Sequence, residues 1–220
     1  MQKLHRCSVI SLNGRGLRDT TKRRSIFTYL KDQKADFYFL QETFSKPSDE
    51  TIWKHEWGGE IFFSHGTCHS KDVCILINRT VKEKVTFIFS DTSGRIILIN
   101  IMYNGLRLSL CNIYVPNDQV QQLIFIQEIN CLLIDRSEIA TLIIGGDWNC
   151  TLSKKDKKGG AHWRPTPYQN LVKITMDTLD LVDIQRARHP KLNKYSFVSK
   201  ALGVIKDRFL SDRSASNKIC

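Results

Sequence analysis

The chain has 220 residues, of which 41% are hydrophobic and 25% are charged, as in an ordinary globular protein. Lys and Arg outnumber Asp and Glu by 33 to 22, so the formal net charge is +11 at pH 7. No apolar run approaches the roughly 18 residues of a membrane span, and the N-terminal apolar stretch is too short for a signal peptide. These properties exclude a membrane-spanning chain and favour a polyanionic partner, either nucleic acid or an anionic membrane surface.

Apolar runs of extended character predict strands along most of the chain. They lie near residues 6–12, 35–41, 59–64, 72–78, 84–90, 94–103, 105–114, 141–146 and 194–199. Asn104-Gly105 separates two of these runs and is a strong signal for a tight hairpin. Part of the sheet is therefore expected to be antiparallel.

Helical periodicity predicts three helices, within residues 20–34, 117–137 and 166–184. Asp19 or Thr20 is expected to cap the first helix. In the third, Thr166 is the expected cap and Pro167 fills the first helical position. Many strands with a few interspersed helices predict an α/β or α+β sandwich of mixed sheets.

The chain is expected to form a single domain over residues 1–220, because no repeat, low-complexity linker or change of composition divides it. Its seven cysteines are odd in number and include no Cys-x-x-Cys pair. Several stand inside strand-like runs, where cysteine behaves as a small hydrophobic residue. We therefore expect an intracellular protein, nuclear or cytoplasmic, that is not secreted.

Polar side chains able to bind a metal or a phosphate follow four of the apolar strands. They are Asn13 in VISLNGRGL, Glu42 in FYFLQETF, Tyr114 in LCNIYVPN, and Asp147 with Asn149 in LIIGGDWN. Each alone has an ordinary explanation as a turn, solvated or packing residue. Loops converge at strand ends of a rigid scaffold, so five such residues from four separate segments predict an active site there.

These motifs, in this order and spacing, resemble the motif set of the exonuclease–endonuclease–phosphatase superfamily. That superfamily includes deoxyribonuclease I, the apurinic endonucleases and the endonuclease domains of LINE-type retrotransposons. The segment LVDIQRARHPKLNKYSFVSK, residues 181–200, is similar to the LINE-type subfamily, in which a helix ends in a D-x-x-R-x-x-H-P stretch before a Y-[ST]-F-x-S strand. The resemblance implies a four-layer fold of two packed mixed β-sheets flanked by helices. It also implies that the protein acts on DNA.

The resemblance also implies roles for the residues at the strand ends. Asp147 matches the aspartate that orients or deprotonates the attacking water, with Asn149 supporting it. Tyr114 matches the tyrosine that contacts the scissile phosphate. Glu42 matches the principal metal ligand, and Asn13 matches the amide beside it. The implied cofactor is Mg²⁺ or Mn²⁺, and Mg²⁺ prefers oxygen ligands of this kind.

The chain departs from the family pattern in its last residues, ALGVIKDRFLSDRSASNKIC. The family ends with an S-R-I-D strand and then an S-D-H motif. In one alignment VIKDRFL is a damaged S-R-I-D-R-F-L, which makes Asp207 a catalytic and metal-binding carboxylate. In the other, LSDRSA is a damaged L-S-D-H-S-A, with Arg213 in place of the histidine. We prefer the first, because D-R-F-L follows the Y-S-F strand at nearly the expected distance.

In either alignment the histidine and the last strand of the family are missing. We therefore expect a domain shortened at its C-terminus, in which the metal site persists. Catalysis is expected to be weak or absent, because one charged donor to the phosphate is lost.

Basic residues outside the motifs are candidates for contacts with DNA. They are Arg15, Lys154, Lys155, Lys157 and Lys158, although the lysine run is equally compatible with a solvated surface. Our first hypothesis is Mg²⁺-dependent nicking of DNA. The alternatives are a non-catalytic DNA-binding remnant of a retroelement and another phosphoesterase of the same superfamily. No obligate protein partner follows from the sequence.

Overall fold

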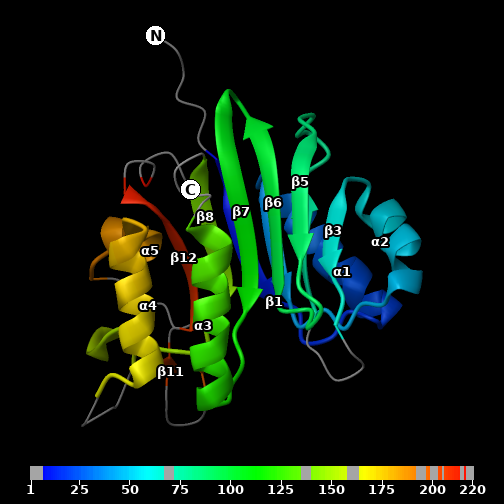
Figure 1. Ribbon diagram of the computed structural model, residues 1–220. Helices are drawn as coiled ribbons and strands as arrows, with labels where there is room; N and C mark the ends of the chain where they lie inside the picture. Colours follow the sequence, from blue (N-terminus) through cyan, green and yellow to red (C-terminus); the bar gives the residue numbers. More distant parts are fainter. Residues whose placement is uncertain are drawn as a thin grey trace.

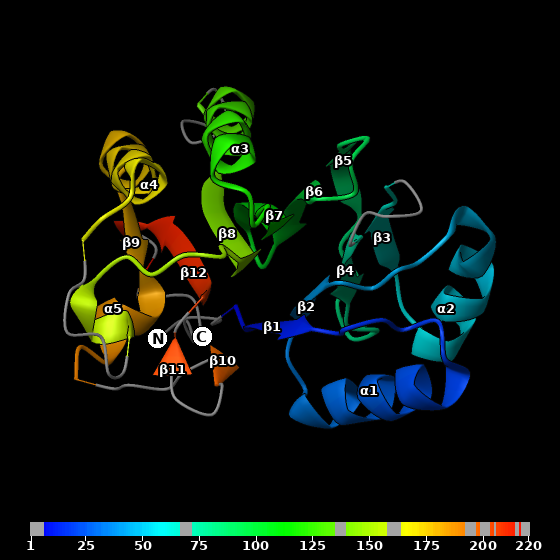
Figure 2. The ribbon, with the colours of Figure 1, turned by 90° about the horizontal axis from the view of Figure 1, so that it is seen from below.

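Two β-sheets pack face to face, with helices on the outer side of each (Figures 1 and 2). The computed structural model describes residues 7–66, 72–134, 140–157, 164–191, 197–198, 203–204, 206–213 and 216. Seen from below in Figure 2, the layers run helix, sheet, sheet, helix. This is the four-layer sandwich of mixed sheets that the sequence predicts.

The four-stranded sheet has the order β1-β2-β4-β3, in which β1 and β2 are parallel and the other pairs antiparallel. Its strands are β1 (Val9–Asn13), β2 (Phe37–Gln41), β3 (Ile61–Ser64) and β4 (Val73–Ile77). Its outer face is covered by α1 (Thr20–Gln33), the 3₁₀ helix η1 (Pro47–Asp49) and α2 (Glu50–Trp57). Phe27 and Leu30 of α1 and Trp53 and Trp57 of α2 are buried against it.

The six-stranded sheet has the order β5-β6-β7-β8-β12-β9, in which β7 and β8 are parallel and the other pairs antiparallel. Its strands are β5 (Val85–Ser90), β6 (Ile96–Tyr103), β7 (Leu106–Tyr114), β8 (Thr141–Asp147), β9 (Leu181–Asp183) and β12 (Asp207–Asp212). Helices α3 (Gln119–Leu133) and α4 (Pro167–Thr178) lie on its outer face. The remaining elements are η2 (Lys154–Asp156), α5 (Ile184–Arg188), β10 (Phe197–Val198) and β11 (Gly203–Val204).

An apolar core fills the space between the two sheets and is built from alternate residues of each strand. Phe39 of β2 packs against Phe209 of β12 in this layer, with ring centroids 5.7 Å apart. A Cβ atom at Gly145 would lie 2.3 Å from the Phe209 ring, so this close packing needs a glycine. The inward row of β8 runs from Ile143 through Gly145 to Asp147. Its last member is therefore a carboxylate at the edge of the apolar layer.

The local signals in the sequence are confirmed. Each strand predicted between residues 6 and 146 is present, with bounds shifted by a few residues; of the strand predicted at 194–199, only Phe197–Val198 lies within the described residues, as β10. Asn104 and Gly105 have φ values of 48° and 79°, as a tight hairpin requires. Asp19 and Thr166 cap α1 and α4 by accepting hydrogen bonds from backbone N–H groups of the first turn.

Helices α2 and α5 and strand β11 were not predicted from the sequence, and one helix end was misplaced; β12 was placed only by the alignment with the S-R-I-D strand. Helix α2 has eight residues, too few for a helical period to stand out. The third predicted helix ends at Thr178 and not at 184, because 181–183 pair with β12 as β9. Strand β12 occupies an interior position and pairs on both sides, with β8 and β9. None of the helices that the structure describes has the length and apolarity needed to cross a bilayer.

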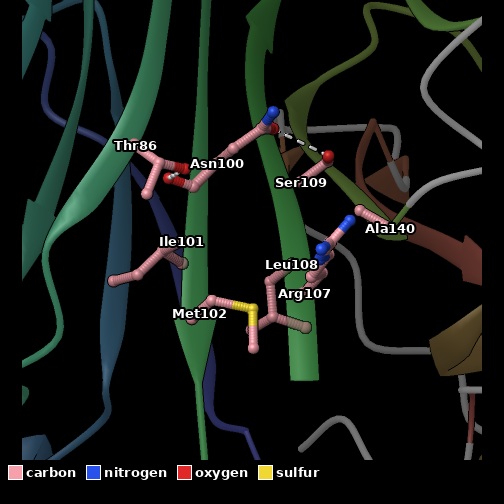
Figure 3. Close-up of a pocket in the computed structure, with 8 residues that line it drawn as sticks. All are labelled: Thr86, Asn100, Ile101, Met102, Arg107, Leu108, Ser109 and Ala140. Atoms are coloured by element: carbon pink, nitrogen blue, oxygen red, sulfur yellow. Dashed lines mark hydrogen bonds between the residues drawn. The ribbon is translucent and has the colours of Figure 1, made fainter. Parts of the chain in front are cut away.

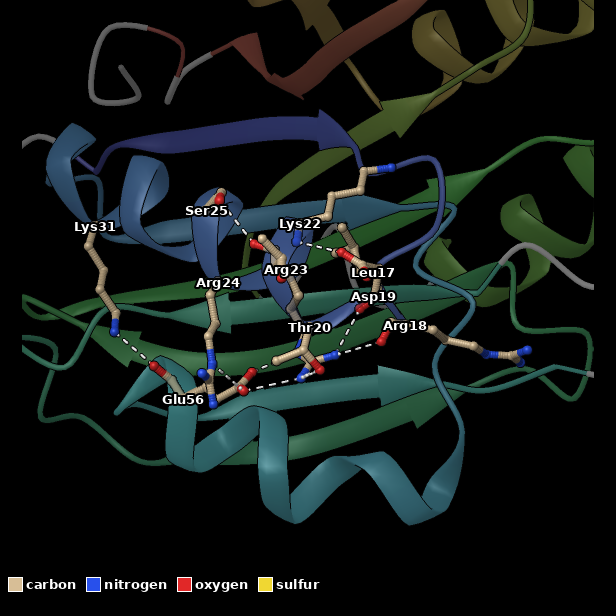
Figure 4. A network of polar contacts seen from close by, with 11 residues as sticks. Leu17, Arg18, Asp19, Thr20, Lys22, Arg23, Arg24, Ser25, Lys31 and Glu56 are labelled. Carbon is tan, nitrogen blue, oxygen red and sulfur yellow. Dashed lines mark hydrogen bonds and ion pairs between the residues drawn. The ribbon is translucent and has the colours of Figure 1, made fainter.

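A buried ion pair joins α1 to α2 (Figure 4). Arg23 Nε lies 2.6 Å from Glu56 Oε2, and the two side chains are only 5% and 9% exposed. Arg23 Nη1 also donates to the Leu17 carbonyl at 3.0 Å, and the guanidinium lies 5.2 Å from the Trp53 ring centroid. Arg24 Nε lies 3.0 Å from the same glutamate, but its side chain is 68% exposed. The two arginines therefore share one partner in very different solvent environments.

We predict that Arg23→Met lowers the free energy of unfolding by about 3–5 kcal/mol, because the Glu56 carboxylate then stays buried without its main partner. Arg24→Met should cost less than about 1 kcal/mol, because its ion pair is exposed to water. Urea denaturation of both variants beside the wild type measures the difference. Equal losses in the two variants would contradict the assignment.

Candidate active site

The ends of five strands converge at one edge of the sandwich, the edge at which the β7 arrow ends in Figure 1. Tyr114 at the end of β7 is the parallel register partner of Asp147 at the end of β8. Asp207 at the start of β12 is the antiparallel partner of the same aspartate. In the other sheet, Asn13 ends β1 beside the β2 residue that precedes Glu42. The topology thus brings these five predicted residues to one edge.

A buried amide pair ties the two sheets together directly below this edge. Gln41 Nε2 donates to Asn112 Oδ1 at 2.7 Å, and Asn112 Nδ2 donates to the Leu40 and Cys74 carbonyls at 2.9 and 2.8 Å. Both amide side chains are 0% exposed. Gln41 also donates to Ser11 Oγ at 3.0 Å, which adds β1 to the network. This pair was not predicted from the sequence. The pattern that indicates it is an amide residue at an inward-facing position of an otherwise apolar strand.

Asp147 carries a strongly perturbed carboxylate and is 8% exposed. Its pKa is raised to about 6, first by burial and then by the negative charge of Asp207, with a smaller contribution from Glu42. The backbone N–H of Asn149, 2.9 Å from Asp147 Oδ1, and the Lys206 ammonium act in the opposite direction. Carboxylates from both sheets therefore repel one another here, and a proton or a cation relieves that repulsion.

The turn after β8 is built around Asn149. Gly146 has a φ of 128°, and a Cβ atom there would lie 2.1 Å from the Ile113 carbonyl oxygen, so glycine is required. Asn149 itself has a φ of 46°. Its Nδ2 donates to the Val115 carbonyl at 2.7 Å, and its Oδ1 accepts from Lys206 Nζ at 3.1 Å. The Asn149 side chain therefore joins the ends of β7, β8 and β12.

The loop after β2 is strained at Glu42, whose φ of 53° is unfavourable for a residue with a side chain. Gly16 N donates to the Glu42 carbonyl at 2.6 Å, so the segment after β1 lies alongside this loop. Arg15 is exposed beside it, and its backbone N donates to Asn13 Oδ1 at 3.1 Å. Strain of this kind is concentrated at functional sites in proteins.

Tyr114 is buried between the sheets, and Arg95 lies against it. The Arg95 guanidinium carbon is 5.4 Å from the Tyr114 ring centroid, and Nη1 donates to the Tyr114 carbonyl at 3.4 Å. The backbone N–H groups of Arg95 and Ile96 both donate to Asp91 Oδ1 at 2.8 Å. The sequence analysis missed Arg95, because it starts a strand outside the recognised motifs.

Oxygen ligands for a divalent cation are present at this edge. Among the described residues, no three His, Cys, Asp or Glu side chains are close enough together to hold a metal by themselves. The predicted ligands are Glu42, Asp207 and Asn13, two carboxylates and an amide. Mg²⁺ is commonly held by one or two carboxylates together with water and substrate phosphate. Since the raised pKa of Asp147 also marks excess negative charge here, the residues fit a cation shared with a substrate.

The basic residues predicted to contact DNA lie near this edge where the structure describes them. Arg15 is exposed beside Asn13. Lys154 and Lys155 are exposed on η2, in the segment that follows β8, and Lys157 is half-buried. Lys158 falls outside the described residues.

Two other features lie away from this edge. Arg213, the alternative replacement for the histidine, follows the far end of β12, where its Nε pairs with exposed Asp180 at 2.9 Å. This position is at the end of β12 opposite to Asp207, so the alignment that gives Asp207 to the site is the one kept here. A cavity of about 450 Å³ lies on the six-stranded sheet toward the β6–β7 turn, lined in part by Asn100, Met102 and Arg107 (Figure 3).

A second buried network holds the start of β12 against the loop after β8. Asp156 is 1% exposed and accepts hydrogen bonds from Arg208 Nη2 at 3.1 Å and Arg186 Nη2 at 2.6 Å. Arg208 Nη1 also lies 3.1 Å from Asp183 Oδ2. Burial alone would raise the pKa of Asp156, but the Arg208 charge and the Arg186 hydrogen bond outweigh it and lower the pKa. Because Arg208 follows Asp207, this network fixes where that carboxylate enters the site.

Comparison with known proteins identifies the family. The profile of the Endonuclease/Exonuclease/phosphatase family matches residues 6–212, nearly the whole chain. The chain belongs to this family. It is also 26% identical over 191 residues to the Transposon TX1 uncharacterized 149 kDa protein of Xenopus laevis. That match covers 87% of the chain but only 14% of the relative. The predicted likeness to an endonuclease domain of a retrotransposon is thereby confirmed.

Solved structures of this family share the fold at low sequence identity. The AP endonuclease LMAP of Leishmania major has a TM-score of 0.75 at 16% identity, covering 95% of this chain and 79% of its own. A 3′ phosphatase of Neisseria, NExo, bound to a product DNA hairpin, has a TM-score of 0.77 at 16% identity, covering 94% and 88%. An AP endonuclease of Archaeoglobus fulgidus has a TM-score of 0.71 at 20% identity, covering 95% and 87%.

We predict that Asp156→Asn lowers the free energy of unfolding at pH 7 by about 3 kcal/mol, because buried Arg208 and partly buried Arg186 lose an anionic partner. A lowered folded-state pKa contributes stability above the unfolded pKa of about 3.9, and this stability is lost as the pH falls through the folded value. The gap between wild type and variant should therefore be constant above about pH 5 and shrink below about pH 4.

Urea denaturation across this pH range tests the prediction, with Asp177→Asn, an exposed carboxylate of α4, as the control. The control should match the wild type at every pH. A gap for Asp156→Asn that does not change with pH would show that its carboxylate charge is not what stabilises the fold.

Proposed function

We propose that this domain is an endonuclease that cuts phosphodiester bonds in DNA with Mg²⁺, or Mn²⁺ in its place. The observation that carries the proposal is the strand register at the site edge. Asp147 stands between Tyr114 and Asp207 on neighbouring strands, and the Glu42 charge from the other sheet acts on it. Membership of the family supports hydrolysis of a phosphate ester.

The role that we propose for each residue follows from its position. Asp147 accepts a proton from the attacking water, a task suited to a carboxylate whose pKa is raised to about 6. The water oxygen bonds to phosphorus, one P–O ester bond breaks, and the leaving oxygen takes a proton from solvent. Asn149 holds the Asp147 carboxylate through its backbone N–H. Tyr114, with Arg95 against its ring, contacts a non-bridging phosphate oxygen.

Glu42, Asp207 and Asn13 are the residues that would hold the cation. When bound, the cation supplies positive charge that stabilises the phosphate as negative charge builds up in the transition state. The Glu42 loop and the turn closed by Arg15 on Asn13 limit the motion of two of these ligands. A site fixed in advance needs little reorganisation during the reaction.

DNA as the substrate is supported by the relatives and by the charge. Two similar solved structures are AP endonucleases, and a third is a 3′ phosphatase bound to product DNA. The net charge of +11 attracts a polyanion. Contacts to the phosphate backbone are assigned to the five basic residues predicted from the sequence, Arg15, Lys154, Lys155, Lys157 and Lys158.

We predict that the purified chain nicks supercoiled plasmid with Mg²⁺ and not with EDTA. Glu42→Ala should reduce the rate by at least about 10²-fold, because the charge that balances the transition state is then poorly held. Glu60→Ala, at an exposed carboxylate before β3, is the matched control and should leave the rate unchanged.

If the wild-type chain binds plasmid but leaves it intact with either metal, the alternative of a non-catalytic DNA-binding domain replaces this proposal. If it nicks plasmid and Glu42→Ala nicks equally fast, the assignment of the site is wrong.

We predict that affinity for duplex DNA falls linearly with salt on logarithmic axes, with a slope of about −0.9 for each phosphate contact. The double variant Lys154→Gln/Lys155→Gln should make the slope shallower by about 2, equally for DNA of different sequences. Lys82→Gln, an exposed lysine before β5 at the opposite end of the sandwich, should not change it. Fluorescence anisotropy titrations between about 50 and 200 mM salt measure the slopes. An unchanged slope in the double variant would remove η2 from the interface.

A further inference from the structure

Lys206 places a positive charge inside the site, at a position where the family pattern has isoleucine. In the S-R-I-D motif with which residues 204–207 align, the position before the aspartate is isoleucine, and here it is lysine. The Lys206 carbonyl accepts the backbone N–H of Trp148 at 3.0 Å, which extends the β8–β12 pairing by one step past Asp207. The backbone of this lysine is therefore fixed beside the strand end that carries Asp147.

The Lys206 side chain turns toward the site residues. Its Nζ donates to Asn149 Oδ1 at 3.1 Å, and the residue is only half-exposed. The ammonium also acts electrostatically on the Asp147 carboxylate. It thus lies among the residues to which the proposed function assigns the attacking water and the phosphate.

The other cations on β12 and directly after it have different attachments. Arg208 forms ion pairs with the carboxylates of Asp156 and Asp183. Breaking these ion pairs would leave buried charges without partners. Arg213 lies at the far end of β12. Lys206 Nζ donates to the neutral amide oxygen of Asn149, and its charge also acts on the Asp147 carboxylate. A charged donor binds an anionic oxygen more strongly than a neutral one, so a phosphate oxygen competes well for this ammonium.

We propose that Lys206 Nζ contacts a non-bridging oxygen of the phosphate that is cut, and stabilises the negative charge that accumulates there. The inference rests on the proposed nuclease function and adds a catalytic residue to it. It gives this chain a charged donor at the position of an apolar residue in the family.

Two substitutions at this position separate charge from packing. Lys206→Met keeps an unbranched side chain of similar length and removes the charge, whereas Lys206→Arg keeps the charge. Lys82→Met removes the same charge at the opposite end of the sandwich and is the control. Single-turnover nicking of plasmid with Mg²⁺ gives the rate, and anisotropy with EDTA gives the Kd for the same DNA. Thermal denaturation of each variant reports whether it is folded.

We expect Lys206→Met to lower the single-turnover rate by about 10²–10³-fold. Its Kd for DNA should stay within about tenfold of the wild type, since only one phosphate contact is lost. Lys206→Arg should recover most of the rate, and Lys82→Met should behave as the wild type. A merely structural role would lower the melting temperature and would not separate the rate from the Kd.

The outcomes distinguish this inference from the function on which it rests. If the wild type nicks, Glu42→Ala does not, and Lys206→Met nicks as fast as Lys82→Met, the role of Lys206 falls and the nuclease function stands. The role of Lys206 also falls if Lys206→Met binds DNA more weakly but nicks bound DNA at the wild-type rate. It falls as well if Lys206→Met is unfolded and the folded Lys206→Arg variant shows the rate loss of about 10²–10³-fold expected for Lys206→Met. If the wild type does not nick with Mg²⁺ or Mn²⁺, both proposals are overturned.

Discussion

Asn112 and Gln41 meet in the apolar space between the two sheets, and the position of every residue at the site edge depends on that contact. Asn112 bonds at once to a side chain and to backbone carbonyls of two strands in the opposite sheet. A slide of one sheet over the other would leave these groups unpaired, at about 1–3 kcal/mol for each buried group. The apolar layer holds the sheets together without fixing their register. The amide pair fixes it, at the last residue of β2 and two residues before the end of β7.

The charges at the edge are arranged by elements that do not belong to the edge themselves. Asp207 takes its place because the next residue, Arg208, is bound to Asp156 and Asp183 behind the six-stranded sheet. Asp147 and Asp207 are thereby held as register partners despite their like charge. Such an arrangement stores electrostatic repulsion in the folded chain. It gives a cation, or the ammonium of Lys206, a favourable place to bind.

The sequence predicts this fold well where the signal is local or where several motifs stand in order. Alternating apolar residues locate the strands, and the Asn104-Gly105 pair locates the hairpin. Asn13, Glu42, Tyr114 and Asp147 are found because each interrupts an apolar run at its end. Strand β12 was found only by alignment with the S-R-I-D strand and not by its apolar pattern, because the strands with which it pairs are remote in sequence. Its residues read as a damaged motif until pairing with β8 puts Asp207 opposite Asp147.

Lys206 and Arg95 were missed for the same reason, since each is remote in sequence from the residue it contacts. Lys206 is 57 residues from Asn149, and Arg95 is 19 residues from Tyr114. Neither breaks an apolar pattern in a way that marks a site. Asn112 and Gln41 do interrupt apolar runs. Each stands inside a recognised motif, LCNIYVPN or FYFLQETF, and was therefore not considered separately from Tyr114 or Glu42. A polar residue on the inward row of a strand deserves its own explanation.

The two glycines before Asp147 make this strand end unusually intolerant of mutation, and each does so for its own reason. At Gly145 the obstacle is two aromatic rings, Phe209 and Phe39, which smaller side chains could replace. At Gly146 the obstacle is a backbone carbonyl and a φ of 128°, which no change elsewhere in the core removes. A substitution at Gly145 can therefore be compensated by a smaller side chain at Phe209 or Phe39. A substitution at Gly146 has no such compensation, because the strand backbone that carries Asp147 must itself move.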